Sequence, residues 1–325
     1  MIQNLPIQQS EISLHLPPAL VDLGESAQRA FLEFFTAQIR NKNTRQAYLR
    51  NVCRFLDWIE SRGATLPDIQ AMHIALYIEQ LGKPKSARGW GYSAPTVKQH
   101  LAALRVFGAF LVIRQIVPTN PAADVRGPKH IVTTGKTPVM AGEDAKALFT
   151  SIDISKPSGL RDKALLGVMV YTFARVSAVC ALELSDYYQV GRRMMFQFQE
   201  KGGRHHVMPA HHTAIEYLDA YIEGLGEKEG PLFRSVNRTR TGFTDRRLDR
   251  REALAMVKRR CKAAGLGDRF TNHTFRATGI TAYLKNEGQL EHAQYMASHA
   301  SPRTTKLYDR RAQEASLDEV ERIIL

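Results

Sequence analysis

Cysteine is scarce in this chain, and the three that occur, Cys53, Cys180 and Cys261, lie far apart. No two of them form a C-x-x-C pair, which excludes a zinc ribbon and a dithiol redox motif. Isolated thiols of this kind are typical of a reducing compartment, where disulfides are rare. We therefore expect three buried thiols and predict a cytoplasmic protein.

Long apolar runs are also missing. The most apolar stretch, Ala164 to Ala174, is too short to cross a bilayer, which takes about 20 residues. Residues 1–25 have neither a positively charged start nor an apolar segment of the kind found in signal peptides. The sequence therefore predicts no secretion signal and no membrane contact.

Acidic residues are in the minority. The chain has 45 Lys and Arg against 32 Asp and Glu, a formal net charge of +13 at pH 7. Such a balance is expected of a protein that binds a polyanion, with nucleic acid the leading candidate. No acid lies between His273 and Arg276, or between His299 and Tyr308. These residues therefore suit an anion beside a hydroxyl nucleophile, and do not suit a metal held by carboxylates.

Periodicity and turn-forming residues divide the 325-residue chain into two domains and three connecting or terminal segments. Apolar residues at helical spacing, with no strand pattern, predict four or five helices in the first domain. The tail is amphipathic and packs either on its own domain or on a neighbouring subunit. The predicted segments are a flexible arm (1–24), a helical domain (25–127), a linker (128–138), a second domain (139–312) and the tail (313–325).

The second domain mixes helical and strand patterns. Its predicted helices are 142–152, 158–173 and 177–184. Alternating residues at 194–199 and 205–208 flank Gly202-Gly203, which predicts a β-hairpin with Lys201 at its tip. The fold class is therefore mainly α with a small β-sheet or hairpin.

The segment from Arg234 to Arg260 is the most basic of the chain. Acids such as Asp245, Asp249 and Glu252 lie among its arginines, so part of it fits a solvated helix face with ion pairs. In a chain this basic, we expect other arginines of the segment to contact phosphates.

Two helix starts are expected near the C-terminus. Thr271 and Asn272 suit a cap before His273, which places His273 and Arg276 on one face of a first helical turn. The free N–H groups of such a turn favour a phosphate. Ser301-Pro302 predicts a second start, with Tyr308 about two turns into that helix.

Five separated elements recur in a fixed order: Arg175, then Lys201 in the hairpin, His273-x-x-Arg276, His299 and Tyr308. This order resembles the tyrosine recombinase (phage integrase-like) family, whose motif is Arg, a hairpin Lys, His-x-x-Arg, His or Trp, and Tyr. The resemblance covers roughly residues 24–312. Three flanking positions depart from the usual pattern: Ala178 replaces an acid, Ser298 replaces a Gly and Ala277 replaces a second His.

The resemblance implies a site-specific recombinase that cuts and rejoins DNA through a covalent 3′-phosphotyrosine. It implies an N-terminal core-binding (SAM-like) domain and a mixed α/β catalytic domain. No cofactor, metal or ATP is expected. The expected partners are double-stranded DNA and a homo-tetramer, or a recombinase partner, on synapsed DNA. The implied catalytic residues are Arg175, Lys201, His273, Arg276, His299 and Tyr308.

Three other functions remain open at this point. A type IB topoisomerase-like enzyme would use the same chemistry to relax supercoils without strand exchange. A non-catalytic DNA-binding protein would not need Tyr308. A metal-dependent phosphoesterase would use the remaining histidine-rich stretch, which comprises His205, His206, His211 and His212.

Overall fold

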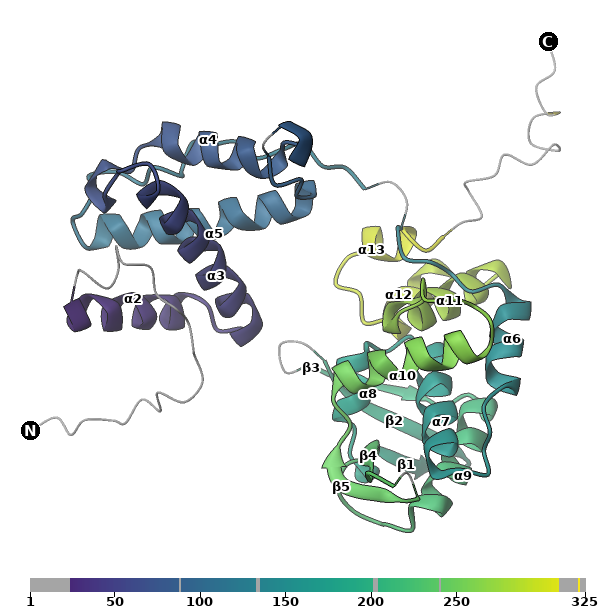
Figure 1. Cartoon of the computed structure of the whole chain (residues 1–325). Helices are drawn as coiled ribbons and strands as arrows, with labels where there is room; N and C mark the ends of the chain where they lie inside the picture. The colour runs from purple at the N-terminus through teal and green to yellow at the C-terminus, as the bar shows by residue number, and fades with distance from the viewer. Residues whose placement is uncertain are drawn as a thin grey trace, which may run out of the picture. The chain divides into compact units, whose positions relative to one another are not determined.

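The computed structural model describes residues 24–87, 89–132, 135–200, 204–239, 241–309 and 321. The chain divides into two compact units, Met1–Ile131 and Val132–Leu325 (Figure 1). We call them the helical unit and, after the domain that the family resemblance implies, the catalytic unit. The predicted arm except Gly24, the tail except Glu321, and Lys201 lie outside the described residues.

The helical unit is built from long helices packed around an aromatic core. Their bounds are α2 Gly24–Gln38, α3 Lys42–Glu60, α4 Ala71–Gly82 and α5 Ala94–Ile113, with short 3₁₀ turns η2 Leu66–Asp68 and η3 Lys85–Ala87. Phe31, Phe55, Tyr77 and Phe107 are all fully buried or nearly so. The predicted helical character of this region is confirmed, with four α-helices among the described residues.

Helix α5 is long and apolar enough to cross a membrane by length and composition alone. In this structure its apolar residues pack into the core of the helical unit, among them Val97, Leu101, Leu104 and Phe107. Helix α5 also carries a buried histidine, His100, whose Nδ1 lies 3.1 Å from the Tyr77 hydroxyl. We therefore interpret α5 as a core helix.

The catalytic unit combines helices with two small antiparallel sheets (Figure 1). Its first half contains α6 Gly142–Thr150, α7 Pro157–Thr172, α8 Val176–Ala181, η4 Leu184–Asp186, β1 Tyr187–Val190, β2 Arg193–Glu200, β3 Arg204–Pro209 and α9 His212–Leu225. Its second half contains β4 Arg234–Val236, β5 Phe243–Arg247, α10 Arg250–Ala263, α11 Asn272–Lys285, α12 Leu290–Met296 and α13 Pro302–Lys306. The predicted hairpin is confirmed as β2–β3, in which Phe196 pairs with Met208 and Glu200 with Arg204.

Close packing of α11 on α7 positions the start of α11. A side chain at Gly279 would place its Cβ 2.1 Å from the carbonyl oxygen of Val170. Only glycine permits this approach of the two backbones. The result is that the motif residues of α11 lie beside the C-terminal end of α7, which leads into Arg175.

Two of the predicted elements are wrong in extent. The helix expected at 177–184 ends at Ala181, and Leu184–Asp186 forms a 3₁₀ turn in which the Asp186 carboxylate accepts the N–H of Glu183 at 2.9 Å. Tyr308 does not lie two turns into a helix. Helix α13 has five residues, and Tyr308 lies in the turn after it, with its N–H donating to the Thr305 carbonyl at 2.9 Å.

Candidate functional site

Helix α11 supplies two of the predicted site residues. Thr271 is its N-cap, and the N–H of Thr271 donates to the Thr274 hydroxyl at 3.0 Å, which fixes where the helix begins. His273 and Arg276 follow in the first turn, as predicted. His273 is exposed, whereas Arg276 is buried.

The Arg276 guanidinium connects three motif segments. One of its Nη atoms donates to the carbonyl of Phe173, and the other donates to the carbonyl of Ala297 at 2.5 Å. Phe173 lies two residues before Arg175, and Ala297 lies two residues before His299. Arg276 is therefore both a candidate anion ligand and the residue that holds two loops in register.

Arg175 is the N-cap of α8 and is half-buried. The chain reaches it through Phe173, whose φ of 54° ends α7 in the left-handed region. Ala178, where the family usually has an acid, is buried on α8 and belongs to the core of the catalytic unit. Ala277, the other alanine departure, is also fully buried.

His299 is buried between α12 and α13. Its Nδ1 lies 2.9 Å from the Thr305 hydroxyl, and its carbonyl accepts the side-chain amide of Gln294 at 3.1 Å. Ser298, just before it, has a φ of 48°. That left-handed conformation favours glycine, which explains physically why glycine is the usual residue here and why Ser298 is strained.

Tyr308 lies against the same group. Its ring is stacked on that of His299, with centroids 5.8 Å apart and an interplanar angle of 7°. Its carbonyl accepts the buried hydroxyl of Thr281 at 3.1 Å. The Tyr308 ring also packs against the small apolar cluster formed by Phe173, Ile280, Leu284, Ala293 and Ala297.

Positive charge dominates the electrostatics of this group. Burial, followed by the charges of Arg276 and Arg175, lowers the pKa of His299 to about 3. The same causes in the same order lower the pKa of His273, although that residue is exposed. Both imidazoles are therefore neutral near pH 7, and Arg175 lies close enough to influence both.

Five of the six predicted site residues are thus brought together: Arg175, His273, Arg276, His299 and Tyr308. The sixth, Lys201, lies outside the described residues. Two further residues of this group, Thr305 and Thr281, are not among the predicted site residues. The only sequence signal for Thr305 is its spacing three residues before Tyr308, and a threonine at that spacing has no distinctive chemistry of its own.

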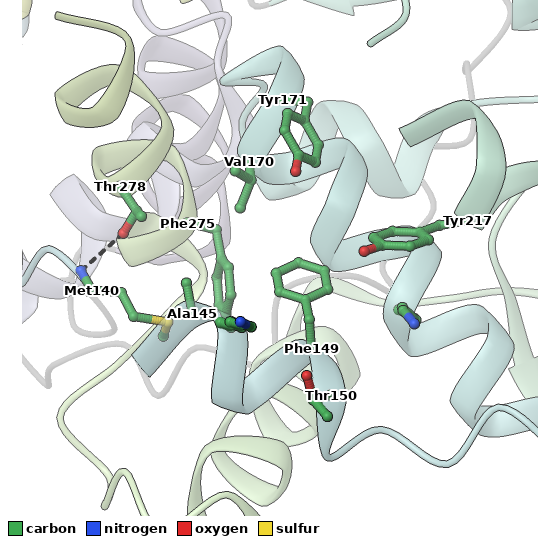
Figure 2. A pocket seen from close by; sticks show the side chains of 11 residues that line it. Met140, Ala145, Phe149, Thr150, Val170, Tyr171, Tyr217, Phe275 and Thr278 are labelled. Atoms are coloured by element: carbon green, nitrogen blue, oxygen red, sulfur yellow. Dashed lines mark hydrogen bonds between the residues drawn. The ribbon is translucent and has the colours of Figure 1, made fainter. Parts of the chain in front are cut away.

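A cavity of about 290 Å³ lies beside α11, which contributes Phe275 and Thr278 to its lining (Figure 2). At roughly 100° per residue, each of these two residues lies between about a quarter and a half turn away from His273 and Arg276. The Thr278 hydroxyl accepts the N–H of Met140 at 3.0 Å and so attaches the start of the catalytic unit to α11. Aromatic rings and two lysines line the rest of the cavity: Phe149, Tyr171, Tyr217, Lys146 and Lys163.

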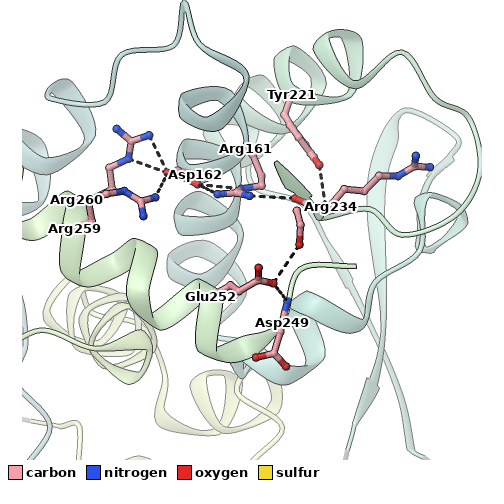
Figure 3. A network of polar contacts seen from close by, with 9 residues as sticks. Arg161, Asp162, Tyr221, Arg234, Asp249, Glu252, Arg259 and Arg260 are labelled. Atoms are coloured by element: carbon pink, nitrogen blue, oxygen red, sulfur yellow. Dashed lines mark hydrogen bonds and ion pairs between the residues drawn. The ribbon is translucent and has the colours of Figure 1, made fainter. Parts of the chain in front are cut away.

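Part of the basic segment is structural. Asp162 is fully buried and accepts hydrogen bonds from Arg161 at 2.6 Å and Arg260 at 2.9 Å, with Arg259 at 3.5 Å (Figure 3). Arg234 is also buried and donates to the carbonyl of Glu229 at 2.6 Å. Arg234 on β4 and the half-buried Arg260 on α10 therefore bind acceptors of the protein itself.

The histidine-rich stretch does not form a metal site in the described part of the chain. His205 and His206 are neighbours on β3 and pair with Gln199 and Phe198, whereas the His211 and His212 rings contact each other at a tilt of 31° with centroids 4.1 Å apart. Among the described residues, no group of three or more His, Cys, Asp or Glu side chains is placed to hold a metal ion.

Comparisons with known proteins match both units. Residues 138–315 match the phage integrase family, and residues 29–115 match the phage integrase N-terminal SAM-like domain. Tyrosine recombinase XerD of Oceanobacillus iheyensis is 28% identical over 274 residues, which cover 82% of this chain and 86% of that protein.

Two solved structures share the fold. The post-cleavage complex of XerH site-specific recombinase with a palindromic difH substrate gives a TM-score of 0.67 at 18% identity, over 86% of this chain and 79% of that one. A lambda integrase tetramer bound to a Holliday junction gives 0.64 at 20% identity, over 88% and 78%.

Proposed function

The chain belongs to the phage integrase family, and from this premise we propose that it is a site-specific DNA recombinase that cuts and rejoins DNA through a covalent 3′-phosphotyrosine intermediate. One observation supports the assignment of its active site most strongly. Arg276 binds the carbonyls that precede Arg175 and His299, and the His299 ring stacks on Tyr308. Cationic hydrogen-bond donors, neutral imidazoles and a phenol therefore lie together in one site.

Tyr308 is the nucleophile in this proposal. Its phenolic oxygen forms a bond to the phosphorus as the bond from phosphorus to the 5′-oxygen breaks. A phenol with a pKa near ~10 is a weak nucleophile at neutral pH and needs a base. His273 is exposed, and its lowered pKa leaves it neutral and able to accept the phenolic proton.

Arg175, Arg276 and His299 bind the non-bridging oxygens. Charge concentrates on these oxygens in the transition state, and guanidinium N–H groups stabilise it through charge-assisted hydrogen bonds. Arg276 has five N–H donors, so it can bind the carbonyls of Phe173 and Ala297 and still donate toward a phosphate. The loss of one such donor typically costs on the order of 2.7–4 kcal/mol of transition-state stabilisation.

Lys201 is the proposed general acid that protonates the departing 5′-oxygen. The position that the sequence predicts for it, next to Gly202-Gly203 in the hairpin, fits this role. Substitution of Lys201 is expected to slow cleavage of ordinary DNA. A 5′-thiolate leaving group needs no proton, so cleavage of a 5′-thio substrate is expected to recover. A variant equally slow on both substrates would rule out this role.

The proposed reaction needs neither metal nor ATP, because the phosphodiester energy is retained in the phosphotyrosine bond. The test is strand exchange between two duplex sites with EDTA present and ATP absent. Wild-type protein is expected to exchange strands, and Tyr308→Phe is not. Relaxation of supercoils without exchange would point to a topoisomerase-like enzyme. Exchange that persists in Tyr308→Phe would remove Tyr308 as the nucleophile.

We propose that Arg250 and Arg251 are the residues of the basic segment that contact phosphates of the DNA backbone. Both are exposed at the start of α10, and the Arg250 carbonyl accepts the side chain of Asn272, next to His273, at 3.4 Å. Each lost phosphate contact is expected to lower the salt dependence of binding by about 0.9 in the log–log slope. Arg260→Ala is a poor alternative probe, because it removes a hydrogen-bond donor from the buried carboxylate of Asp162.

The proposed assembly is a homo-tetramer on synapsed double-stranded DNA in the cytoplasm. We propose that the C-terminal tail of one subunit occupies the cavity behind α11 of its neighbour. The tail carries apolar residues at helical spacing together with acids, and the cavity offers aromatic rings beside Lys146 and Lys163. The tail residues concerned are Leu317, Asp318, Glu319, Val320, Glu321, Ile323 and Ile324.

Deletion of 313–325 tests this assembly. The truncated protein is expected to bind a single DNA site normally and to fail in synapsis. A Lys146→Glu, Lys163→Glu double variant is expected to behave in the same way, because it reverses the charge that the acidic tail meets. Equal loss of single-site binding and synapsis in the truncated protein would contradict the proposal.

A further inference from the structure

One buried threonine contacts both the proposed phosphate ligand and the proposed nucleophile. Thr305 is fully buried in α13. Its hydroxyl lies 2.9 Å from Nδ1 of His299, and its carbonyl accepts the N–H of Tyr308 at 2.9 Å.

The backbone around His299 is held independently of Thr305. The N–H of His299 donates to the Gln294 carbonyl at 3.0 Å, and the His299 carbonyl accepts the Gln294 amide at 3.1 Å. These contacts to the His299 backbone do not fix the rotation of the imidazole about its side-chain bonds. Its Nδ1 meets the Thr305 hydroxyl, so that hydroxyl determines which ring nitrogen carries the proton.

The two tautomers differ in what they present to DNA. If the hydroxyl donates to Nδ1, the proton of the neutral ring is on Nε2, and the ring is a hydrogen-bond donor. If Nδ1 carries the proton, Nε2 presents a lone pair, which repels a phosphate oxygen. The ring is neutral near pH 7, since its pKa is lowered to about 3, so the choice between tautomers is a real one.

We propose that Thr305 is a positioning residue: its hydroxyl donates to Nδ1 of His299 and so fixes the Nε2–H tautomer that binds the scissile phosphate. This inference rests on the proposed recombinase function and adds a specific requirement to it. The Thr305 carbonyl meanwhile holds the turn that carries Tyr308, and the stacked rings keep donor and nucleophile in register.

Thr305→Val tests the hydroxyl, because valine has the same shape and cannot donate. We expect formation of the covalent adduct on a nicked duplex to slow by roughly 10- to 100-fold. Thr305→Ser keeps the hydroxyl and is expected to stay within about threefold of wild type. A Thr305→Val protein as fast as wild type would overturn the proposal.

Two further measurements separate positioning from a general structural effect. Nitrogen-15 NMR of the imidazole, assigned by comparison with His299→Gln, is expected to show the Nε2–H form in wild type and Thr305→Ser, and its loss in Thr305→Val. In a His299→Gln background, Thr305→Val is expected to cause little additional slowing, since its effect passes through the imidazole. An unchanged tautomer, or a full additional loss in that background, would overturn the inference.

The same experiment distinguishes this inference from the function on which it rests. Wild-type protein that forms no adduct contradicts the recombinase proposal itself. Wild-type protein that forms an adduct, together with Thr305→Val that forms it equally fast, contradicts only the role of Thr305.

Discussion

The imidazole of His299 lies parallel to the phenol ring of Tyr308, with the ring planes 7° apart and the centroids separated by 5.8 Å. Tyr308 itself lies in a turn after a five-residue helix, where its N–H donates to the carbonyl of Thr305. Contacts from outside this turn add to that local bond: the Thr281 hydroxyl donates to the Tyr308 carbonyl, and the His299 ring stacks on the phenol ring. The proposed nucleophile is therefore positioned by tertiary contacts as well as by its turn.

Arg276→Lys is expected to impair both activity and stability. Lysine keeps the charge, but it cannot donate to the carbonyls of Phe173 and Ala297 with a planar fork. We expect adduct formation to fall by roughly 10²–10³-fold and the free energy of unfolding to fall by about 2–3 kcal/mol. Single-turnover cleavage and chemical denaturation measure the two effects.

Arg303→Lys is the matched control for Arg276→Lys. Arg303 lies in α13 close to the same residues in sequence, but it is exposed. Its replacement is expected to change both quantities little. If Arg276→Lys behaves like Arg303→Lys, the three motif segments are not held together by the Arg276 guanidinium.

Ser298→Gly is expected to stabilise the catalytic unit. The φ of 48° at Ser298 costs an L-residue roughly 1–2 kcal/mol, and glycine is free of that cost. Glycine also gains entropy in the unfolded chain, which offsets about 0.5–1 kcal/mol. A net gain of up to about 1 kcal/mol should raise the thermal transition seen by circular dichroism, and a Ser298→Ala control should show no gain.

Gly135→Ala is expected to slow cleavage without unfolding the protein. The N–H of Gly135 donates to the Leu307 carbonyl at 3.1 Å, and an added Cβ would lie 2.5 Å from that oxygen. Alanine therefore pushes on the residue before Tyr308, and a displacement near 1 Å can cost about 10²-fold in rate. Gly142→Ala is the control, because nothing lies within 4 Å of its added Cβ. Equal rates for the two variants would show that the Leu307 contact does not control Tyr308.

The stability of the helical unit is expected to fall in mild acid because of His100. Burial, followed by the charge of Arg54, lowers the pKa of His100 to about 4, below the unfolded value of about 6.5. The unfolded chain therefore binds the proton more readily, and stability is lost as pH falls from about 6.5 towards 4. Its contribution approaches about 1.4 kcal/mol per pH unit in that window.

Tryptophan fluorescence measures this effect selectively, because both tryptophans of the chain, Trp58 and Trp90, lie in the helical unit. Denaturation curves at several pH values give the slope. Replacing His100 by glutamine removes the titrating group while keeping hydrogen-bonding capacity, so the slope should become shallower. An identical slope in His100→Gln would assign the pH dependence to other groups.

Much of this architecture could be predicted from the sequence, because it is encoded by local patterns. Apolar residues at helical spacing indicated the helical unit, and the Gly202-Gly203 turn between alternating residues indicated the β2–β3 hairpin. The order of Arg175, His273-x-x-Arg276, His299 and Tyr308 indicated which residues to look for. These local patterns can be recognised without knowledge of the tertiary structure.

Other features belong to short elements or depend on tertiary contacts, and they left no local signal. Strands β1, β4 and β5 have three to five residues, too few for a clear alternation. The structural role of Arg260 depends on Asp162, which lies 98 positions away. The hydrogen bond between the Thr305 hydroxyl and Nδ1 of His299 depends on where α13 lies relative to His299. Nothing in the sequence alone distinguishes that threonine from Thr304.

In the proposed reaction, Tyr308 becomes covalently attached to DNA at a site organised by Arg276 and His299. The most direct test is to incubate the full chain, without metal, with nicked duplexes made from its own flanking DNA, and to map any SDS-resistant adduct by mass spectrometry. We expect a nucleotide-modified peptide containing Tyr308, and no adduct from Tyr308→Phe. Protein that binds those duplexes but yields no adduct, or an adduct on another residue, would contradict it.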